Sequence, residues 1–293
     1  MNVLIIGRSG QLAAELQQAR WPNDARPIAL GRSQIDLTDA AATATTVAAQ
    51  QPAIIVNAAG YTAVDRAETE RAQAFAINEL GPKHLAAAAA GLGVPLIHVS
   101  TDYVFSGGGQ RPWRETDEPR PLSVYGQSKL AGEHAVAATL RQYVILRTSW
   151  VFAAHGQNFL RTMLRLGKER NCLSIVDDQC GCPTAAADLA RVIIEVTAGL
   201  LRGHDAFGIY HYAGKEAVSW FQFARAIFEL ARDLVPELPL LVPITTAEFA
   251  APAPRPANSV LDCAKIEHEW GVSRAFWRDG LTLALATLRA AEF

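Results

Sequence analysis

Short, mostly apolar runs alternate with alanine-rich segments through the first half of the chain, and this alternation constrains the fold most. The runs occupy residues 3–6, 28–30, 54–56, 96–99 and 144–146. Because they do not alternate in polarity, we expect strands buried on both faces, as in a parallel sheet. The segments between them, residues 11–19, 40–49, 72–90 and 128–139, favour helix and supply the crossovers that parallel strands need. The pattern predicts an α/β, doubly wound parallel sheet.

The alternation becomes irregular after residue 150, and prolines gather at positions 252, 254 and 256. We therefore predict a first domain over residues 1–150 and a smaller C-terminal domain over residues 151–293. Within the second part, a strand at 173–176 and a helix at 185–197 are expected to return to the main sheet, so that residues 172–200 rejoin the first domain.

Charge and composition exclude several classes of protein. The 293 residues carry 27 Lys+Arg and 29 Asp+Glu, so the basic excess of a nucleic-acid-binding protein is missing. No apolar run approaches the ~20 residues that span a bilayer, and the first residues lack the pattern of a signal peptide. We expect a cytoplasmic protein with no nucleic-acid or membrane partner. The four cysteines form no CxxC pair and are interpreted as reduced, although Cys180-Gly181-Cys182 leaves metal chelation open.

A glycine-rich turn follows the first strand directly, in the sequence Gly7-Arg8-Ser9-Gly10-Gln11-Leu12-Ala13. Gly7 and Gly10 allow a tight turn and a close approach of the backbone to a pyrophosphate, and the next helix offers unpaired N–H groups to that anion. A generic glycine-rich turn is the alternative. Strand, glycines and helix together favour a Rossmann-type dinucleotide site.

The end of the second strand indicates which dinucleotide binds. Arg32 and Ser33 follow it, and a guanidinium pairs with the 2′-phosphate of NADP rather than with a free ribose hydroxyl. NADPH is therefore the expected cofactor, with NADH as the alternative. Asp36 and Leu37 are either turn residues or contacts to the adenine, and Thr38 is a candidate N-cap for the next helix.

Tyr125 and Lys129 form the strongest candidate for chemistry. Residues four apart share one face of a helix, so the Lys129 ammonium can lie near the Tyr125 phenol. A fixed positive charge favours phenolate and lowers the pKa of the phenol from its usual ~10 toward neutrality. Thr101 ends the fourth predicted strand and would deliver a hydroxyl to the same crevice.

Several further motifs carry a family resemblance. They are Asn57 to Asp65, Ser100 to Phe105, Arg147-Thr148-Ser149-Trp150, Asp177-Asp178-Gln179 and Arg255-Pro256-x-Asn258-Ser259. Together with the glycine turn and Tyr125 to Lys129, they resemble the extended short-chain dehydrogenase/reductase superfamily and, within it, the dTDP-4-dehydrorhamnose reductase family. The resemblance covers nearly the whole chain.

This resemblance implies a role for each motif. It places the proton donor on Tyr125, the activating and ribose-binding lysine on Lys129 and a substrate-positioning hydroxyl on Thr101. The implied cofactor contacts are Gly7, Gly10, Gln11, Leu12, Arg32, Asp36, Leu37, Gly60, Tyr61, Thr62, Tyr125 and Lys129. The implied substrate contacts are Thr101, Asp102, Trp150, Gln179, Arg255 and Asn258. Residues 1–150 would then bind NADP and residues 151–293 the substrate.

The resemblance implies NADPH-dependent reduction of the C4 ketone of dTDP-4-dehydro-L-rhamnose, the last step of dTDP-L-rhamnose synthesis, by a monomer or homodimer. Other nucleotide-sugar reductases and epimerases of the superfamily are alternatives. Dehydratases typically carry Asp-Glu after the threonine, where this chain has Asp102-Tyr103. A non-catalytic regulatory subunit that binds NADP is the alternative hypothesis outside the enzymes. Some family members use magnesium at an acidic cluster; residues 290–293 contain none, so no metal is expected.

Overall fold

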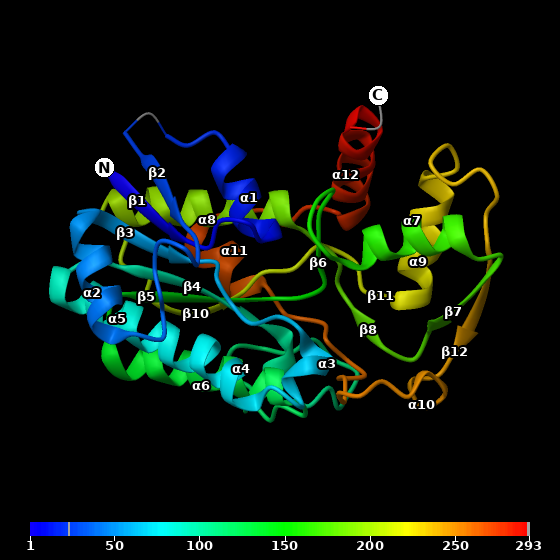
Figure 1. Cartoon of the computed structure of the whole chain (residues 1–293), viewed down its shortest axis with the longest axis horizontal. Helices are drawn as coiled ribbons and strands as arrows, with labels where there is room; N and C mark the ends of the chain where they lie inside the picture. Colours follow the sequence, from blue (N-terminus) through cyan, green and yellow to red (C-terminus); the bar gives the residue numbers. More distant parts are fainter. Residues whose placement is uncertain (23, 292–293) are drawn as a thin grey trace.

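The computed structural model, which describes residues 1–22 and 24–291, is built around a six-stranded parallel sheet (Figure 1). In spatial order its strands are β10 (Gly208–His211), β5 (Tyr143–Thr148), β4 (Leu96–Thr101), β3 (Pro52–Asn57), β1 (Asn2–Ile6) and β2 (Arg26–Leu30). The five apolar runs are confirmed as strands, and the α/β prediction is confirmed with them. The sixth strand, β10, was missed because it is short and ends in histidine.

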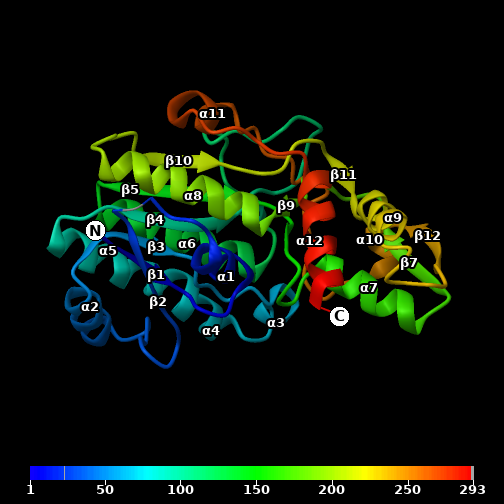
Figure 2. The same cartoon turned by 90° about the horizontal axis from the view of Figure 1, so that it is seen from above.

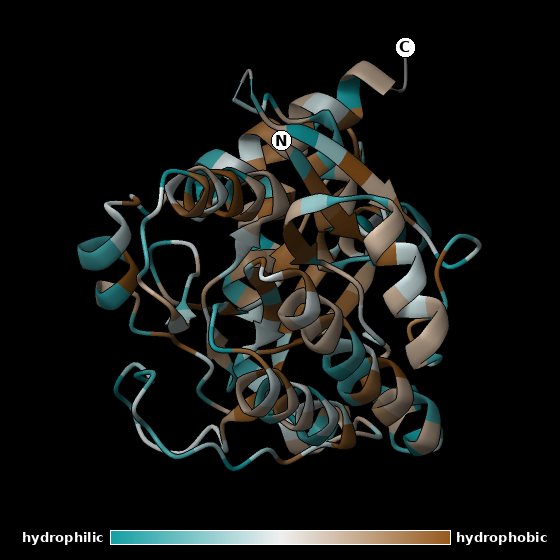
Figure 3. Cartoon of the chain, turned by 90° about the vertical axis from the view of Figure 1, so that its left-hand side faces the viewer, coloured by the Kyte–Doolittle hydropathy of each residue, from teal (hydrophilic) through white to brown (hydrophobic). Residues whose placement is uncertain are grey.

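Alternate residues of each strand pack on opposite faces of the sheet, which explains why the runs are apolar throughout. Val3 and Ile5 share a core with helices α1 (Gln11–Gln18) and α8 (Ala186–Leu201). Leu4 and Ile6 belong to a second core with α2 (Ala40–Ala49), α5 (Gly81–Leu92) and α6 (Val124–Thr139). Figure 2 shows α8 lying along one face, and Figure 3 shows the hydrophobic strands enclosed between the two helical layers.

The predicted helix over residues 72–90 is three consecutive pieces instead of one. These are α4 (Arg71–Phe75), a π-helical segment η1 (Ala76–Leu80) and α5. Helix α6 begins four residues before the predicted start, because the Ser123 hydroxyl caps it by accepting from the Gly126 N–H at 3.2 Å. Short elements α3 (Val64–Ala67) and η2 (Asp102–Val104) follow β3 and β4.

A second group of elements packs beyond the carboxyl end of the sheet, at the right of Figure 1. It contains α7 (Phe159–Glu169), α9 (Trp220–Leu230), α10 (Thr246–Phe249), α12 (Trp277–Ala291) and strands β7 (Cys172–Val176) and β12 (Leu240–Ile244). Two small strand pairs accompany this group: β6 (Val151–Phe152) pairs with β9 (Thr184–Ala185), and β8 (Cys180–Gly181) pairs with β11 (Val218–Ser219). Helix α11 (Ala264–Trp270) lies near β10.

The strand expected to return to the main sheet does not do so. Strand β7 pairs in parallel with β12, and its Leu173 and Ile175 pack in the second core, so that part of the prediction is wrong. Helix α8 does pack against the main sheet through Leu189 and Ile193. The division into domains at residue 150 stays a prediction.

The strand order reverses between β1 and β3, because β2 lies on one side of this pair and β4, β5 and β10 lie on the other. In doubly wound sheets, ligands bind in the crevice outside the carboxyl ends of the strands at such a point. In the part of the chain that the structure describes, no helix is long and apolar enough to cross a membrane.

Candidate active site

The glycine turn after β1 leaves room for an anion at the start of α1. Gly7 has φ +113°, and a Cβ there would lie 3.3 Å from backbone atoms of Ala58 and Ala59. Gly10 is the N-cap of α1 and offers no capping side chain, and a Cβ on it would meet no described atom within 4 Å. This open space beside Gly10 leaves room for a pyrophosphate at the start of α1, where helix N–H groups lack intrahelical partners.

Gln11 connects this turn to the segment that precedes α7. Its side-chain carbonyl accepts from the Asn158 amide at 2.8 Å, and its own amide donates to the Gln157 carbonyl at 3.4 Å. The Leu12 side chain is largely buried in the core beneath the turn, and its contact with the cofactor stays a prediction. Gln11 thus joins the first half of the chain to the second at the edge of the crevice.

Two guanidinium groups stand near the end of β2, where one was predicted. Arg32 is exposed there, and Arg8 packs over Gly31, whose Cβ would lie 3.2 Å from that of Arg8. Arg8 also donates to Gln34 at 3.3 Å. The sequence analysis gave Arg8 no role, although a basic residue between Gly7 and Gly10 was a signal for a second cation near the 2′-phosphate.

Asp36 and Leu37 serve the local turn in this structure. The carboxylate of Asp36 accepts from the hydroxyl and N–H of Thr38, and these hydrogen bonds hold its pKa below the usual range. Leu37 packs against Gly81 of α5. The predicted N-cap at Thr38 is wrong by one residue, since Asp39 caps α2 by accepting from the Ala42 N–H at 2.9 Å.

Asn78, which sequence reasoning missed, holds the Gly60-Tyr61-Thr62 loop after β3. Its side-chain oxygen accepts from the Tyr61 N–H at 2.8 Å, and its amide donates to the Tyr61 carbonyl at 3.0 Å. The same amide donates to the Ser128 hydroxyl of α6 at 3.0 Å. Asn78 lies in the π-helical segment η1, and such segments often occur at functional sites.

Thr101, Asp102 and Tyr125 meet at the carboxyl end of β4. The Thr101 hydroxyl donates to Asp102 at 2.9 Å, and a Thr101 hydrogen bond also lowers the pKa of Tyr125. Burial nevertheless raises the pKa of Tyr125 to about 12, and the charge of Asp102 raises it further. Burial raises the pKa of Asp102 to about 6, against hydrogen bonds from Ser259 and Thr101. The expected lowering of the Tyr125 pKa is therefore wrong for this structure, because burial outweighs the effect of Thr101.

Lys129 lies one helical turn below Tyr125, buried between α6 and the sheet. Its ammonium donates to the Val99 carbonyl at 2.7 Å, and a Cβ at Gly60 would lie 4.0 Å from it. Burial lowers the pKa of Lys129 to about 8, and the charge of Glu133 opposes that shift. The structure thus brings Thr101, Tyr125 and Lys129 together at the sheet edge, beside the Gly60 loop.

Trp150 and Gln179 are joined by Trp220, a residue that sequence reasoning missed. The Trp150 and Trp220 rings stack with centroids 3.5 Å apart, and the Trp220 N–H donates to the Gln179 side chain at 3.2 Å. Trp150 has φ +49°, a left-handed conformation that is costly for a residue with a side chain and often occurs at functional sites. A Cβ at Gly181 would overlap the Trp150 ring at 2.4 Å, so glycine is needed there.

Arg255 and Asn258 form several hydrogen bonds with other residues of the protein. Arg255 pairs with Asp65 of α3 at 2.9 Å. The Asn258 amide donates to the carbonyls of Gly109 and Arg111, and its side-chain oxygen accepts from the Val260 N–H. Asn258 therefore ties two loops together, and its contact with substrate stays a prediction.

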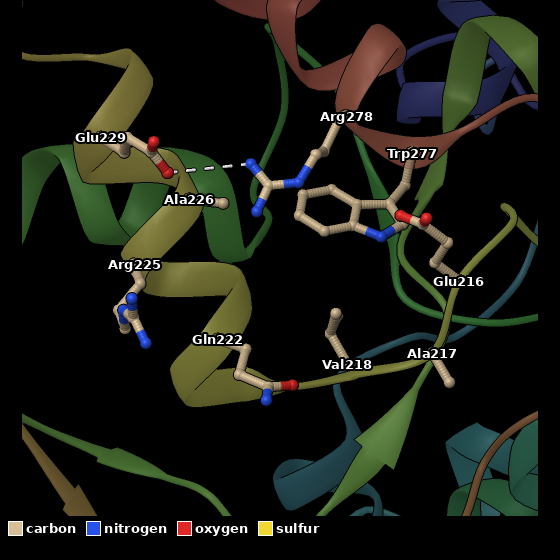
Figure 4. Close-up of a pocket in the computed structure, with 9 residues that line it drawn as sticks. All are labelled: Glu216, Ala217, Val218, Gln222, Arg225, Ala226, Glu229, Trp277 and Arg278. Atoms are coloured by element: carbon tan, nitrogen blue, oxygen red, sulfur yellow. Dashed lines mark ion pairs between the residues drawn. The ribbon is translucent and has the colours of Figure 1, made fainter.

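The described residues contain no candidate metal centre, and the cavity described below lies away from the predicted site residues. Among residues 1–22 and 24–291, no group of three or more His, Cys, Asp or Glu could hold a metal ion. Of the C-terminal residues 290–293, in which no acidic cluster was expected, residues 292 and 293 lie outside the described range. A cavity of about 490 Å³ between α9 and α12 is lined by Glu216, Arg225 and Trp277 among others (Figure 4). Because it contains none of the predicted site residues, it does not mark the active site.

The Rossmann sheet, the glycine turn and the Thr101, Tyr125 and Lys129 group define a dinucleotide-dependent oxidoreductase of the extended short-chain dehydrogenase/reductase class. The family model described as RmlD substrate binding domain matches residues 1–290. A dTDP-4-dehydrorhamnose reductase of Sinorhizobium fredii is 42% identical over 95% of both chains. The chain belongs to the dTDP-4-dehydrorhamnose reductase family.

Solved structures agree with this assignment. A dTDP-4-dehydrorhamnose reductase of Clostridium acetobutylicum superposes with a TM-score of 0.92 at 37% identity, covering 99% of this chain and 100% of that one. The Bacillus anthracis dTDP-4-dehydrorhamnose reductase, in complex with NADP, gives a TM-score of 0.89 at 36% identity over 98% and 99% of the two chains.

Proposed function

We propose that the protein reduces the C4 ketone of dTDP-4-dehydro-L-rhamnose to the alcohol, giving dTDP-L-rhamnose, with NADPH as the reductant. The observation that carries this proposal is the convergence of Thr101, Tyr125 and Lys129 beside the Gly60 loop in a chain of this family. The Bacillus anthracis relative bound to NADP supports the choice of cofactor.

The residues around the crevice fit NADPH. The open N-terminus of α1 suits the pyrophosphate, and Arg8 with Arg32 offers two cations for the 2′-phosphate. Gln11 and the loop held by Asn78 flank the same crevice. When bound, the reduced nicotinamide supplies the hydride that reduces the ketone carbon.

Tyr125 would protonate the oxygen of the reduced carbonyl. Its raised pKa means that the phenol keeps its proton at neutral pH, which is the state a proton donor needs. Thr101 would donate a hydrogen bond to the same oxygen, where negative charge develops. Lys129, buried and cationic below its pKa of about 8, would stabilise the phenolate left after proton transfer and orient the cofactor ribose.

The substrate would lie between the sheet edge and the second group of elements. We assign the sugar to Thr101, Asp102 and the stacked Trp150, because these side chains border Tyr125 or follow β5. Gln179 and Arg255 would contact the nucleotide diphosphate, with Arg255 supplying positive charge while paired to Asp65. Asn258 would act through the loops that it connects.

The test is turnover of purified protein with NADPH and dTDP-4-dehydrorhamnose. We expect loss of the reduced-nicotinamide absorbance together with a product heavier by two hydrogens. A flat absorbance trace with correctly folded protein would reject the reductase proposal, and NADPH binding without turnover would favour the regulatory-subunit alternative. Sedimentation of the same sample distinguishes a monomer from a homodimer, the two states that the family resemblance leaves open.

A further inference from the structure

A buried ion pair lies one helical turn beyond Lys129, and no step of the proposed reaction uses it. Glu133 of α6 and Arg147 of β5 are 1% and 2% exposed, with Nη2 and Oε2 2.6 Å apart. The Arg147 Nε donates to both carboxylate oxygens, at 3.0 and 3.1 Å. Buried ion pairs repay their desolvation poorly, and apolar residues of similar volume often stabilise a fold as well. Stability alone is therefore a weak reason for charges at this position.

The pair belongs to a ladder of polar contacts between α6 and β4. Tyr125, Lys129 and Glu133 are spaced four apart and share one face of the helix. Three consecutive residues of β4, Val99, Ser100 and Thr101, lie opposite this helix face. The Ser100 hydroxyl donates to Glu133, the Val99 carbonyl accepts from Lys129, and Thr101 acts on Tyr125 by lowering the pKa of its phenol. Glu133 is thus the inner end of the same helix face that carries the reacting phenol.

The charged and titratable groups around Lys129 come from three elements, α6, β5 and β4. Glu133 and the neutral Tyr125 face it from α6, and Arg147 stands behind Glu133 on β5. His98 faces it from β4, where burial and then the Lys129 charge hold the histidine pKa well below its usual range, so that His98 is neutral. Glu133 is the group that opposes the effect of burial on Lys129.

Arg147 is itself held from the far side. It reaches His211 of β10 at 3.4 Å, and His211 contacts the Trp113 carbonyl at 3.0 Å. Burial lowers the pKa of His211 to about 3, so the neutral ring accepts from Arg147 and donates to Trp113. The Trp113 indole N–H in turn donates to the Asn258 carbonyl at 2.9 Å. The ion pair therefore also connects α6 to the loop that carries Asn258.

We propose that Glu133, fixed by Arg147 and by Ser100, the residue next to the Val99 carbonyl that holds Lys129, is a positioning residue that keeps the Lys129 ammonium charged during turnover. This inference rests on the proposed reductase function. It assigns Glu133 no contact with substrate or cofactor. Its effect passes through Lys129.

The test is the pH profile of kcat/KM for Glu133→Gln. Removing a negative charge lowers the pKa of each nearby group, so the limb at which activity falls on the alkaline side should move to lower pH. An opposite charge within ~4–6 Å is worth ~1–3 pKa units, and we expect a shift of about one unit. At a pH above the limb, that corresponds to about a tenfold loss of activity. Glu133→Asp, which keeps the charge, should recover part of the shift.

Val136→Ala is the matched control, because Val136 lies fully buried on the same helix but carries no charge. It should lower stability and leave the alkaline limb where it is. An equal shift in Glu133→Gln and Val136→Ala would overturn the proposal, as would a wild-type profile in folded Glu133→Gln. Failure of wild-type protein to turn over would reject the reductase function instead.

Glu133→Gln leaves Arg147 buried without its anion, which can cost ~3–5 kcal/mol and unfold the chain. The double variant Glu133→Gln/Arg147→Met removes both charges and should restore folding. Because Glu133 shares a helix face with Lys129, whereas Arg147 lies on β5 beyond Glu133, we expect the loss of the Glu133 charge to dominate, so the alkaline limb of the double variant should still lie at lower pH than that of the wild type. A wild-type limb in the folded double variant would overturn the proposal.

Discussion

Asn78→Ala should weaken both the fold and cofactor binding. Asn78 is 1% exposed and joins the Tyr61 backbone to Ser128 through three hydrogen bonds of 2.8 to 3.0 Å. Alanine removes all three and leaves the N–H and carbonyl of Tyr61 without their partner. Ser128 is less affected, since its hydroxyl still donates to the Tyr125 carbonyl at 2.8 Å.

The magnitude follows from the two backbone groups. A buried polar group left without a hydrogen bond costs ~1–3 kcal/mol, so the free energy of unfolding should fall by about 2–5 kcal/mol in total. The Gly60-Tyr61-Thr62 loop also loses its attachment to η1 and α6. If that loop contacts the cofactor, ordering it on binding should raise KM for NADPH by about tenfold, which corresponds to ~1.4 kcal/mol.

Urea unfolding and NADPH titration measure the two effects separately. Asn2→Ala is the control, since it removes one hydrogen bond, from the Asn2 amide to the Gln50 carbonyl at 2.7 Å, far from the crevice. That variant should lose only ~0.5–1.5 kcal/mol and keep the KM for NADPH unchanged. If Asn78→Ala were no less stable than Asn2→Ala, the three contacts would not hold the loop, and the reasoning would be refuted.

Three further changes test the site. Tyr125→Phe should lower kcat by ~10²–10⁴-fold while NADPH binding, followed by fluorescence, stays intact; near-normal turnover would remove Tyr125 as proton donor. Arg8→Ala and Arg32→Ala should each reduce the preference for NADPH over NADH in kcat/KM, and a preference unchanged in both would place the 2′-phosphate elsewhere. Asp102→Asn should gain stability relative to wild type as pH rises from about 4 to about 6 in urea titrations. The folded-state pKa of Asp102 is raised, so folding binds a proton in that window and wild-type stability falls as the proton leaves.

The sheet was predictable because each of its first five strands carries its own signal. Burial on both faces makes residues such as Val3 and Leu4 both apolar, whichever core they enter. The break in the helix between residues 72 and 90 was not predictable from composition, because alanine favours every piece equally. What sets the π-helical register at Asn78 is a tertiary contact, its hydrogen bonds to Tyr61 and Ser128.

The pairing of β7 with β12 shows a related limit. The sequence predicts a buried strand at residues 173–176, but the pattern of a strand does not identify the strand with which it pairs. The partner, Leu240–Ile244, includes Pro243 and exposed Leu240, so it carries little of the pattern of a buried strand. The prediction therefore placed this strand in the main sheet, whereas it pairs with β12 in the second group of elements.

Trp150 shows most clearly where local reasoning ends. The motif that contains it was readable, and so was Gln179, but neither pattern reveals that Trp220 lies between them. Stacking requires a left-handed backbone at Trp150 and the absence of a side chain at Gly181, two conditions that act only once β8 and α9 have docked. The strain at Trp150 has to be offset by these contacts. A residue that sequence reasoning proposes for the sugar thus obtains its orientation from a tryptophan 70 positions later, which is why the aromatic wall of this site becomes visible only in three dimensions.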